Sequence, residues 1–321
     1  MTIKNVAVTG ATGFVGRFIV DELLARGYAV RALARDRAKA IAVLPQRSNL
    51  EVVVGEVGDA SACCDLVAPA QACIHLVGII RPVGRQTFER IHVGATRHML
   101  EACAHAGVSR YVHMSALGAS PLSRAEYQRS KFAAETLVRA SGLDWTIFRP
   151  GLIHGAQGEF MRMAAKWCRS AAPPHIFLPY FSRRERGPAG SAVVTPTIDP
   201  VYVLDVARAF CDALERPTTV GEIYPLVGGS PLDWRAFLTT LRDALPNVGP
   251  RLEAIGLPGE LMAMKARMAT MVGLGNFLPF DEGMALMGQQ DSTASLTKTQ
   301  AHLNYAPIGF RNALPLYAAS M

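Results

Sequence analysis

The first half of the chain alternates between short apolar runs and longer segments with helical periodicity. The apolar runs lie at residues 5–9, 29–34, 50–55, 72–77, 110–114 and 145–148. Between them, segments at 14–26, 61–68, 88–106 and 126–141, with a weaker one at 38–44, repeat apolar residues at helical spacing. Continuous apolar strands are typical of sheets buried on both faces, and strand–helix alternation favours parallel strands with right-handed crossovers. The pattern therefore predicts an α/β fold with a doubly wound parallel sheet.

The pattern changes after residue 151. Pro173-Pro174 and a predicted loop at 182–190 interrupt it, and residues 201–214 and 224–227 predict one more helix and one more strand. From residue 231 onward the chain is helix-rich and irregular. We expect the sheet domain to span 1–157 and to be rejoined by about 192–227, with 158–321 as a smaller, mostly helical C-terminal domain.

Composition narrows the function classes. Of the 321 residues, half are hydrophobic and 18% are charged, which excludes a disordered or fibrous protein. Lys and Arg number 33 against 26 Asp and Glu, giving a net charge of +7, but the bases are scattered. Scattered bases do not form the clustered footprint of a nucleic-acid-binding protein, so we expect no nucleic-acid partner and a mild preference for anionic ligands.

The sequence also bears on location and on metals. No apolar stretch of about 18 residues predicts a membrane span. The strand pattern follows directly after Lys4, so we expect no signal or transit peptide and a cytoplasmic protein. The six Cys show no Cys-x-x-Cys pair, and the eight His show no ligand spacing. We therefore expect reduced core thiols and no metal site.

A glycine-rich turn joins the first predicted strand to the first predicted helix. In residues 9–16, Gly10 allows a tight turn, Gly13 lets backbone approach a pyrophosphate, and Gly16 lets helix pack on strand. The helix N-terminus adds free N–H donors. In this context the turn predicts a Rossmann dinucleotide site. The expected cofactor contacts here are Gly10, Thr12, Gly13, Phe14, Val15 and Gly16.

Two arginines bear on which dinucleotide is bound. NAD-type sites carry an acidic residue at the end of the second strand, where this chain has Arg35, and Arg17 follows the third glycine. Guanidinium groups suit a 2′-phosphate, so the sequence favours NADP(H). Asp36, one residue later, keeps NAD(H) open.

A Tyr–Lys pair follows the fifth predicted strand. Tyr127 and Lys131 are spaced i, i+4 and share one face of a predicted helix. A nearby ammonium stabilises a phenolate and so lowers a Tyr pKa toward the range useful for proton transfer.

With the turn at 9–16, the Tyr127/Lys131 pair and Arg149-Pro150-Gly151, the chain resembles the extended or atypical branch of the short-chain dehydrogenase/reductase superfamily. The resemblance implies that Tyr127 is the acid/base, that Lys131 holds the nicotinamide ribose, and that Ser115 is the catalytic hydroxyl. It further implies cofactor contacts from residues that follow the third, fourth and sixth strands: Glu56, Val57, Leu76, Val77, Gly78, Pro150 and Gly151.

A narrower resemblance covers nearly the whole chain. Segments 75–80, 88–95, 112–119, 200–207 and 313–317 look like the bacterial group similar to alpha-subcomplex subunit nine, the NAD(P)H-binding accessory subunit of respiratory complex I. Such sequences are often labelled NAD-dependent epimerase/dehydratase. This resemblance implies a structural, assembly or redox-sensing role, with a respiratory complex or a membrane surface, including the inner membrane, as a partner.

Three departures separate the chain from active members of the superfamily. Ala116 follows Ser115 where they usually carry a second Ser, His92 replaces a usual Asn, and eleven residues separate Ser115 from Tyr127. These features favour cofactor binding without turnover. The intact Tyr–Lys pair favours an active reductase or epimerase/dehydratase acting on a nucleotide sugar, a lipid or a quinone. Both hypotheses stay open.

Two further features have open interpretations. Arginines outside the cofactor motif predict contacts to a nicotinamide-side or phosphorylated ligand, or a solvated loop: Arg81, Arg85, Arg162, Arg183, Arg184 and Arg186. Residues 261–271 predict an amphipathic helix rich in Met. Its apolar stripe favours packing against the core, and a surface for a partner helix, a quinone tail or a membrane interface is the alternative.

Overall fold

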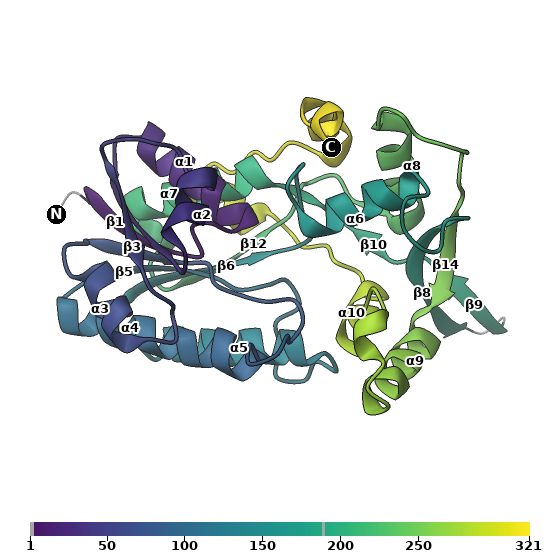
Figure 1. Ribbon diagram of the computed structural model, residues 1–321, viewed down its shortest axis with the longest axis horizontal. Coiled ribbons are helices and arrows are strands. Elements are labelled where there is room, and N and C mark those ends of the chain that lie inside the picture. The colour runs from purple at the N-terminus through teal and green to yellow at the C-terminus, as the bar shows by residue number, and fades with distance from the viewer. Residues whose placement is uncertain (1–2, 188–189) are drawn as a thin grey trace.

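A seven-stranded parallel sheet forms the centre of the computed structural model, which describes residues 3–187 and 190–321 (Figure 1). The strand order is β12-β6-β5-β4-β1-β2-β3, and every neighbouring pair is parallel. The strands are β1 (Asn5–Thr9), β2 (Ala29–Ala34), β3 (Leu50–Val54), β4 (Ala72–His75), β5 (Arg110–Met114), β6 (Asp144–Pro150) and β12 (Glu222–Leu226). The predicted doubly wound α/β fold is confirmed.

Helices cover both faces of this sheet. One face carries α1 (Phe14–Ala25), α2 (Arg37–Val43) and α7 (Val203–Glu215), and the other carries α3 (Ala60–Val67), α4 (Ala95–Ala106) and α5 (Glu126–Arg139) (Figure 1). The region predicted as one helix over 88–106 begins with a π-helical turn at Glu89–Gly94 before α4. The apolar residues of the inner strands are buried on both sides, as their continuous runs predict, whereas the edge strand β3 is only partly buried and its Val54 is exposed.

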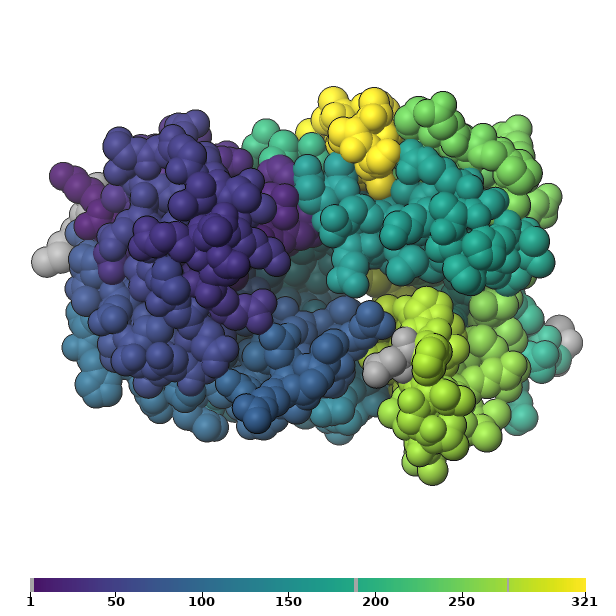
Figure 2. Space-filling model, in the orientation of Figure 1, coloured from purple at the N-terminus to yellow at the C-terminus, as the bar shows by residue number. Residues whose placement is uncertain are grey.

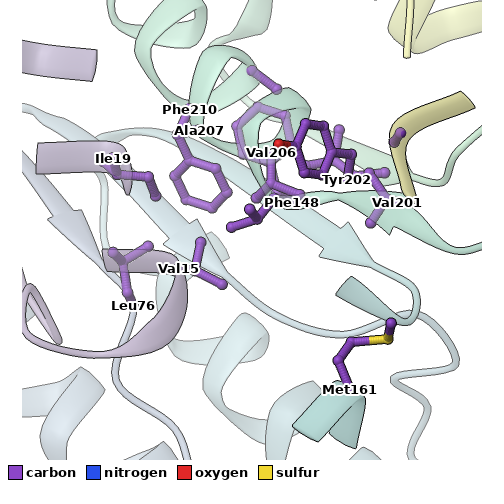
Figure 3. Packing of buried hydrophobic residues seen from close by; sticks show 14 of the residues in the cluster. Val15, Ile19, Leu76, Phe148, Met161, Val201, Tyr202, Val206, Ala207 and Phe210 are labelled. Carbon is purple, nitrogen blue, oxygen red and sulfur yellow. The ribbon is translucent and has the colours of Figure 1, made fainter. Parts of the chain in front are cut away.

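The core on the α1 face shows how distant segments are tied together. Ile19 of α1, Phe148 of β6 and Phe210 of α7 pack against one another across this face (Figure 3). The Phe148 and Phe210 ring centroids are 4.6 Å apart. Residues 203–226 thus return to the large sheet through α7 and β12, while the exact domain boundaries stay predictions.

The C-terminal part carries a second, smaller sheet in addition to its helices. Its strands are β8 (Leu178–Gly187), β9 (Gly190–Val194) and β14 (Ala254–Pro258), in the order β14-β8-β9. Two two-stranded sheets pair β10 (Thr197–Ile198) with β13 (Leu232–Asp233), and β11 (Val201–Tyr202) with β7 (Ile153–His154). The helices are α6 (Glu159–Cys168), α8 (Trp234–Ala244), α9 (Gly259–Met271), α10 (Glu282–Gly288), α11 (Thr297–Leu303) and α12 (Phe310–Ala313).

The predicted loop at 182–190 is wrong. Residues 182–187 continue β8 and pair antiparallel with β9, with Arg183 opposite Val194 and Glu185 opposite Ala192. Arg and Gly are typical of loops, but here the partner strand supplies the backbone hydrogen bonds. Residues 188–189 of that prediction, like Met1 and Thr2 at the start of the chain, lie outside the described residues.

The Met-rich segment forms the expected helix, α9, but its apolar stripe does not pack on the core. Met264, Met268 and Met271 are exposed, whereas Ala263 and Ala266 face α10 and are buried. The prediction of a core-facing Met stripe is therefore wrong. Among the described residues, no helix combines the length and apolarity needed to cross a bilayer.

Candidate functional site

The glycine turn between β1 and α1 has the geometry of a phosphate cradle. Gly10 has φ +71°, in the left-handed region that favours glycine, and the Gly13 N–H donates to the Gly10 carbonyl at 3.0 Å. A Cβ on Gly16 would stand 2.1 Å from the Gly10 oxygen, so α1 approaches the turn more closely than any side chain allows. No described side chain caps the N-terminus of α1, and its first turn holds no acidic residue. Its N–H donors are therefore available to an anion.

This turn opens into a cavity of about 640 Å³ at the carboxyl ends of β1 to β5. That volume is within the range of small-molecule sites. The predicted residues that line it are Gly10, Thr12, Gly13, Phe14, Val15, Gly16, Arg35, Glu56, Val57, Leu76, Val77 and Gly78. The cavity lining does not include Arg17, Ser115, Tyr127, Lys131, Pro150 or Gly151.

Several lining residues were missed by the sequence analysis. They are Leu33, Ala34, Gly55, Gly58, Ile79, Gln86, Arg90, Ile91 and Met114, while Arg85, which was considered as a ligand contact, lines the cavity as well. Most of them lie in the last residues of a strand or in the loop that follows one. The rule that ligands bind at the carboxyl ends of parallel strands could have found these residues, except for Arg90 and Ile91, which lie in the π-helical turn.

Charges around the cavity are mainly basic. Arg35 is exposed and lines it, and Arg90 donates to Glu56 at 2.9 Å across its rim. Asp36 accepts a hydrogen bond from the Lys39 backbone at 3.1 Å and caps α2. The acidic residue that kept an NAD-type contact open therefore has a local structural partner.

Lys131 lies directly behind the cavity. Its Nζ donates to the Met114 carbonyl at 3.1 Å and lies 2.8 Å from the place where a Cβ on Gly78 would stand. Gly78 and Met114 both line the cavity, so the ammonium reaches its rear wall. Burial lowers the pKa of Lys131 to about 8, against the opposing effect of the Glu135 carboxylate.

Tyr127 is held by aromatic neighbours. Its ring meets His92 edge-on at 5.5 Å and Phe88 at 6.0 Å. Burial raises the pKa of Tyr127 to about 12. The i, i+4 spacing places Tyr127 and Lys131 on α5 as predicted, but the expected lowering of the phenol pKa by the ammonium is wrong because desolvation decides its direction.

Ser115 and His92 show the consequences of the sequence departures. Ser115 is buried, and its Oγ has no hydrogen-bond partner within residues 3–187 and 190–321. His92 accepts from the Ile79 N–H at 3.0 Å through Nε2, and its Nδ1 lies 2.8 Å from the Ser130 hydroxyl. Burial lowers the pKa of His92 to about 2, so the ring is neutral and fixes a backbone segment of the cavity wall.

A second cavity, of about 780 Å³, lies between β8, β14, α9 and α10 and the loop before α5. Arg183 and Arg184 line it, whereas Arg162 and Arg186 do not. Arg183 is ion-paired with Glu185 at 2.7 Å and with Asp291 at 2.8 Å. Its charge is already balanced by protein carboxylates, which weakens the expectation that it binds a phosphorylated ligand.

Over residues 3–187 and 190–321, the structure shows no cluster of three or more His, Cys, Asp or Glu suited to a metal ion, and all six Cys are free thiols.

Comparison with known proteins agrees with this geometry. Residues 10–164 match a protein-family model described as NAD(P)H-binding. NADH dehydrogenase [ubiquinone] 1 alpha subcomplex subunit 9 of Dictyostelium discoideum is 26% identical over 239 residues, covering 74% of this chain and 62% of that protein. Ceramide reductase of Caulobacter vibrioides is 35% identical over 150 residues, covering 47% of this chain and 46% of that protein. The chain thus spans about half to three fifths of these relatives.

A solved structure shares the fold over nearly the whole chain. MoeE5 in complex with UDP-glucose and NAD is 21% identical with a TM-score of 0.70, covering 97% of this chain and 96% of that one.

Proposed function

The chain carries an NAD(P)H-binding domain and is related to the complex I alpha-subcomplex subunit 9 proteins, and on this premise we propose that it binds NADP(H) in a structural, assembly or redox-sensing role. The proposal rests on the contrast between the cofactor cavity and the surroundings of the catalytic candidates Ser115 and Tyr127. Twelve of the predicted cofactor residues line the cavity at the glycine turn, whereas the Ser115 hydroxyl is buried without a hydrogen-bond partner among the described residues and the pKa of Tyr127 is raised. Cofactor binding needs the cavity. Turnover needs a Ser115 hydroxyl that can reach a substrate and a Tyr127 phenol that can transfer a proton.

The preference for NADP(H) over NAD(H) rests on the end of β2. Arg35 is exposed and lines the cavity, where a guanidinium suits a 2′-phosphate. Asp36 caps α2 and does not line the cavity. An NAD-type ribose contact would have to share this carboxylate with the cap, whose single bond uses Oδ1.

The test starts with the purified protein. Mass spectrometry of the protein as isolated identifies any copurified nucleotide, and calorimetric titration then compares NADPH, NADP, NADH and NAD. The proposal expects NADP(H) to copurify or to bind at least tenfold more tightly than NAD(H). Weak binding with free exchange of all four nucleotides would contradict it.

An active reductase or epimerase/dehydratase is the second candidate, and one observation favours it. Tyr127 and Lys131 share α5, and the lowered pKa of Lys131 lets this group change charge near neutral pH. In that reaction Tyr127 would donate a proton to the oxygen of a carbonyl whose carbon accepts the hydride that a bound nicotinamide would supply. A nucleotide sugar, a lipid or a quinone fits this chemistry, and the ceramide reductase relative adds weight to a lipid.

Tyr127→Phe separates the two candidates. An enzyme loses turnover at least a hundredfold in this variant and keeps its cofactor affinity. Unchanged NADPH consumption with a true carbonyl substrate would remove Tyr127 from the mechanism.

The subunit 9 relationship also suggests where the protein acts. We further propose that the protein is cytoplasmic and contacts a respiratory complex or the inner-membrane surface. In this proposal the residues after 157 provide the substrate or partner contacts. Pull-down with the cofactor-loaded protein and with a Gly16→Ala variant as control tests this part.

A further inference from the structure

One face of α9 presents a continuous apolar stripe to solvent. Leu261, Met264, Met268 and Met271 are spaced i, i+3, i+7 and i+10, and their exposed fractions rise from 40% at Leu261 to 77% at Met271. This spacing keeps all four on one side of a helix.

The other side of α9 is already occupied. Ala263 and Ala266 are buried, and Met262 packs with Ala285 and Leu286 of α10. The helix therefore has its core contact, and the Met stripe is additional apolar surface that the fold does not use.

The apolar surface continues past the end of the helix. Val272, Leu274 and Phe277 are exposed by 70%, 53% and 82%. Scattered exposed apolar residues are normal on a protein surface, but a contiguous set marks a contact site. We call the seven exposed residues of 261–277 the α9 ridge: Leu261, Met264, Met268, Met271, Val272, Leu274 and Phe277.

The shape of this region favours a broad, deformable surface as the partner over a protein that offers a groove. The α9–α10 pair projects from the body of the molecule, at the lower right of Figures 1 and 2. Leu261 also lines the second cavity, but the other six residues of the ridge are exposed side chains of this projecting region, which suits insertion into a soft interface.

Charges flank the ridge in a pattern that complements an anionic surface. At 3.6 residues per turn, Lys265 and Arg267 each lie about 80° from the middle of the stripe, on opposite sides. Both are exposed. Between Glu260 and Asp281 the sequence holds no acidic residue. Glu260 itself is engaged by Arg124 at 2.7 Å.

We propose that the α9 ridge docks the protein on an anionic lipid bilayer. The Met, Leu and Phe side chains enter the boundary between headgroups and acyl chains, while Lys265 and Arg267 extend their charged ends to the headgroup phosphates. The formal net charge of +7 adds attraction at longer range. This inference rests on the part of the proposed function that places the protein at a membrane surface, and it deepens that part by naming the segment and the lipid; it holds whether or not the protein turns over a substrate.

Vesicle flotation of the full chain tests the proposal. Vesicles of phosphatidylcholine, with or without phosphatidylglycerol, are mixed with the protein and floated through a density gradient. The proposal expects flotation with the anionic vesicles, at least tenfold less with the neutral ones, and loss of binding at high salt.

Two double variants and one control assign the binding to the α9 ridge. Met268→Glu/Met271→Glu is expected to lower the bound fraction at least tenfold, and Lys265→Glu/Arg267→Glu to abolish the preference for anionic lipid. Leu316→Glu replaces an exposed apolar residue near the C-terminus, away from α9, and leaves binding unchanged. Thermal unfolding and NADPH affinity, which these exposed sites do not touch, verify that each variant is folded.

Other results overturn the proposal. Absence of flotation from both vesicle types does so, as does equal flotation of wild type and Met268→Glu/Met271→Glu. A wild-type dimer in light scattering that becomes a monomer in this variant, without lipid binding, would assign the ridge to self-association.

Discussion

Replacing Gly16 by alanine tests whether cofactor binding depends on the close approach of α1 to the glycine turn. A Cβ at this position would stand 2.1 Å from the Gly10 oxygen and 2.8 Å from the Ala11 Cα. Both neighbours are backbone atoms of the turn, so no side-chain rotation relieves the clash. The helix and the turn must separate by about 0.9 Å to reach even the shortest Cβ contacts, which are near 3.0 Å.

The size of the effect follows from this displacement. Overpacking costs about 1–3 kcal/mol, and the better helix propensity of alanine returns up to about 1 kcal/mol. We therefore expect Gly16→Ala to lower the free energy of unfolding by up to about 3 kcal/mol. The same shift moves the N–H donors of the turn away from an anion. Each hydrogen bond to a charged group is worth about 1.5–3 kcal/mol, so loss of one raises the Kd for NADPH about tenfold to a hundredfold.

Calorimetric titration with NADPH and urea unfolding measure the two effects. Gly94→Ala is the matched control, because Gly94 is also helical but its Cβ would meet the Glu89 oxygen at an ordinary 3.6 Å. We expect this variant to be as stable as the wild type or slightly more so, with unchanged affinity. A folded Gly16→Ala variant that binds NADPH as tightly as the wild type would refute the reasoning.

Three further predictions concern charged groups. Arg35→Gln should weaken the affinity for NADPH at least tenfold in calorimetry and leave the affinity for NADH unchanged. The control is Arg37→Gln, which should change neither affinity because the Arg37 guanidinium donates to a backbone carbonyl of β3. An equal loss of affinity for both nucleotides would contradict the assignment of Arg35 to the 2′-phosphate. The pKa of Lys131 is about 8 in the folded protein, below its usual 10.5, so the unfolded chain binds more protons between these two pH values. The free energy of unfolding therefore increases by up to about 3 kcal/mol as the pH rises through this window. Lys131→Met should remove this increase in urea unfolding measured at several pH values, and parallel pH profiles of variant and wild type would refute it. Arg149→Ala should cost about 3–5 kcal/mol of unfolding free energy because it leaves the Glu135 carboxylate, which is fully buried and bonded at 2.6 Å, without its partner; a loss under about 1 kcal/mol would show that water reaches this carboxylate.

The sequence predicted the large sheet well because its signals are local. Each apolar run overlaps a strand and extends at most two residues past its end, and the glycine turn at residues 9–16 marks the junction of the first strand and helix. For a given strand order, the right-handed crossovers then fix which face of the sheet each connecting helix covers. For the same reason, twelve of the predicted cofactor residues line one cavity, since the ends of neighbouring parallel strands meet at one edge.

The second sheet was not predictable in this way. Strand β8 depends on pairing with β9 and β14, and β14 lies about seventy residues away in the sequence. Its Arg-rich second half carries no apolar alternation, so composition indicated a loop. The prediction that the Met stripe of α9 packs on the core was wrong for a different reason. The two faces of this helix both hold small or apolar residues, and periodicity does not say which of two such faces meets the rest of the protein.

The difference between local and long-range signals also applies to the candidate site, where it separates the cofactor cavity from the Tyr127/Lys131 pair. The cavity is built largely from backbone and small residues at strand ends, so the spacing of the glycine turn predicted its presence, and the family resemblance implied the lining residues after β3 and β4. The chemistry of Tyr127 depends instead on desolvation by Phe88 and His92, which lie more than thirty residues earlier in the sequence. A pair such as Tyr127 and Lys131 can therefore keep its spacing while burial moves the phenol pKa away from the working range. Because the cavity needs only the fold, a chain of this kind can retain cofactor binding when the surroundings of its Tyr–Lys pair no longer support proton transfer.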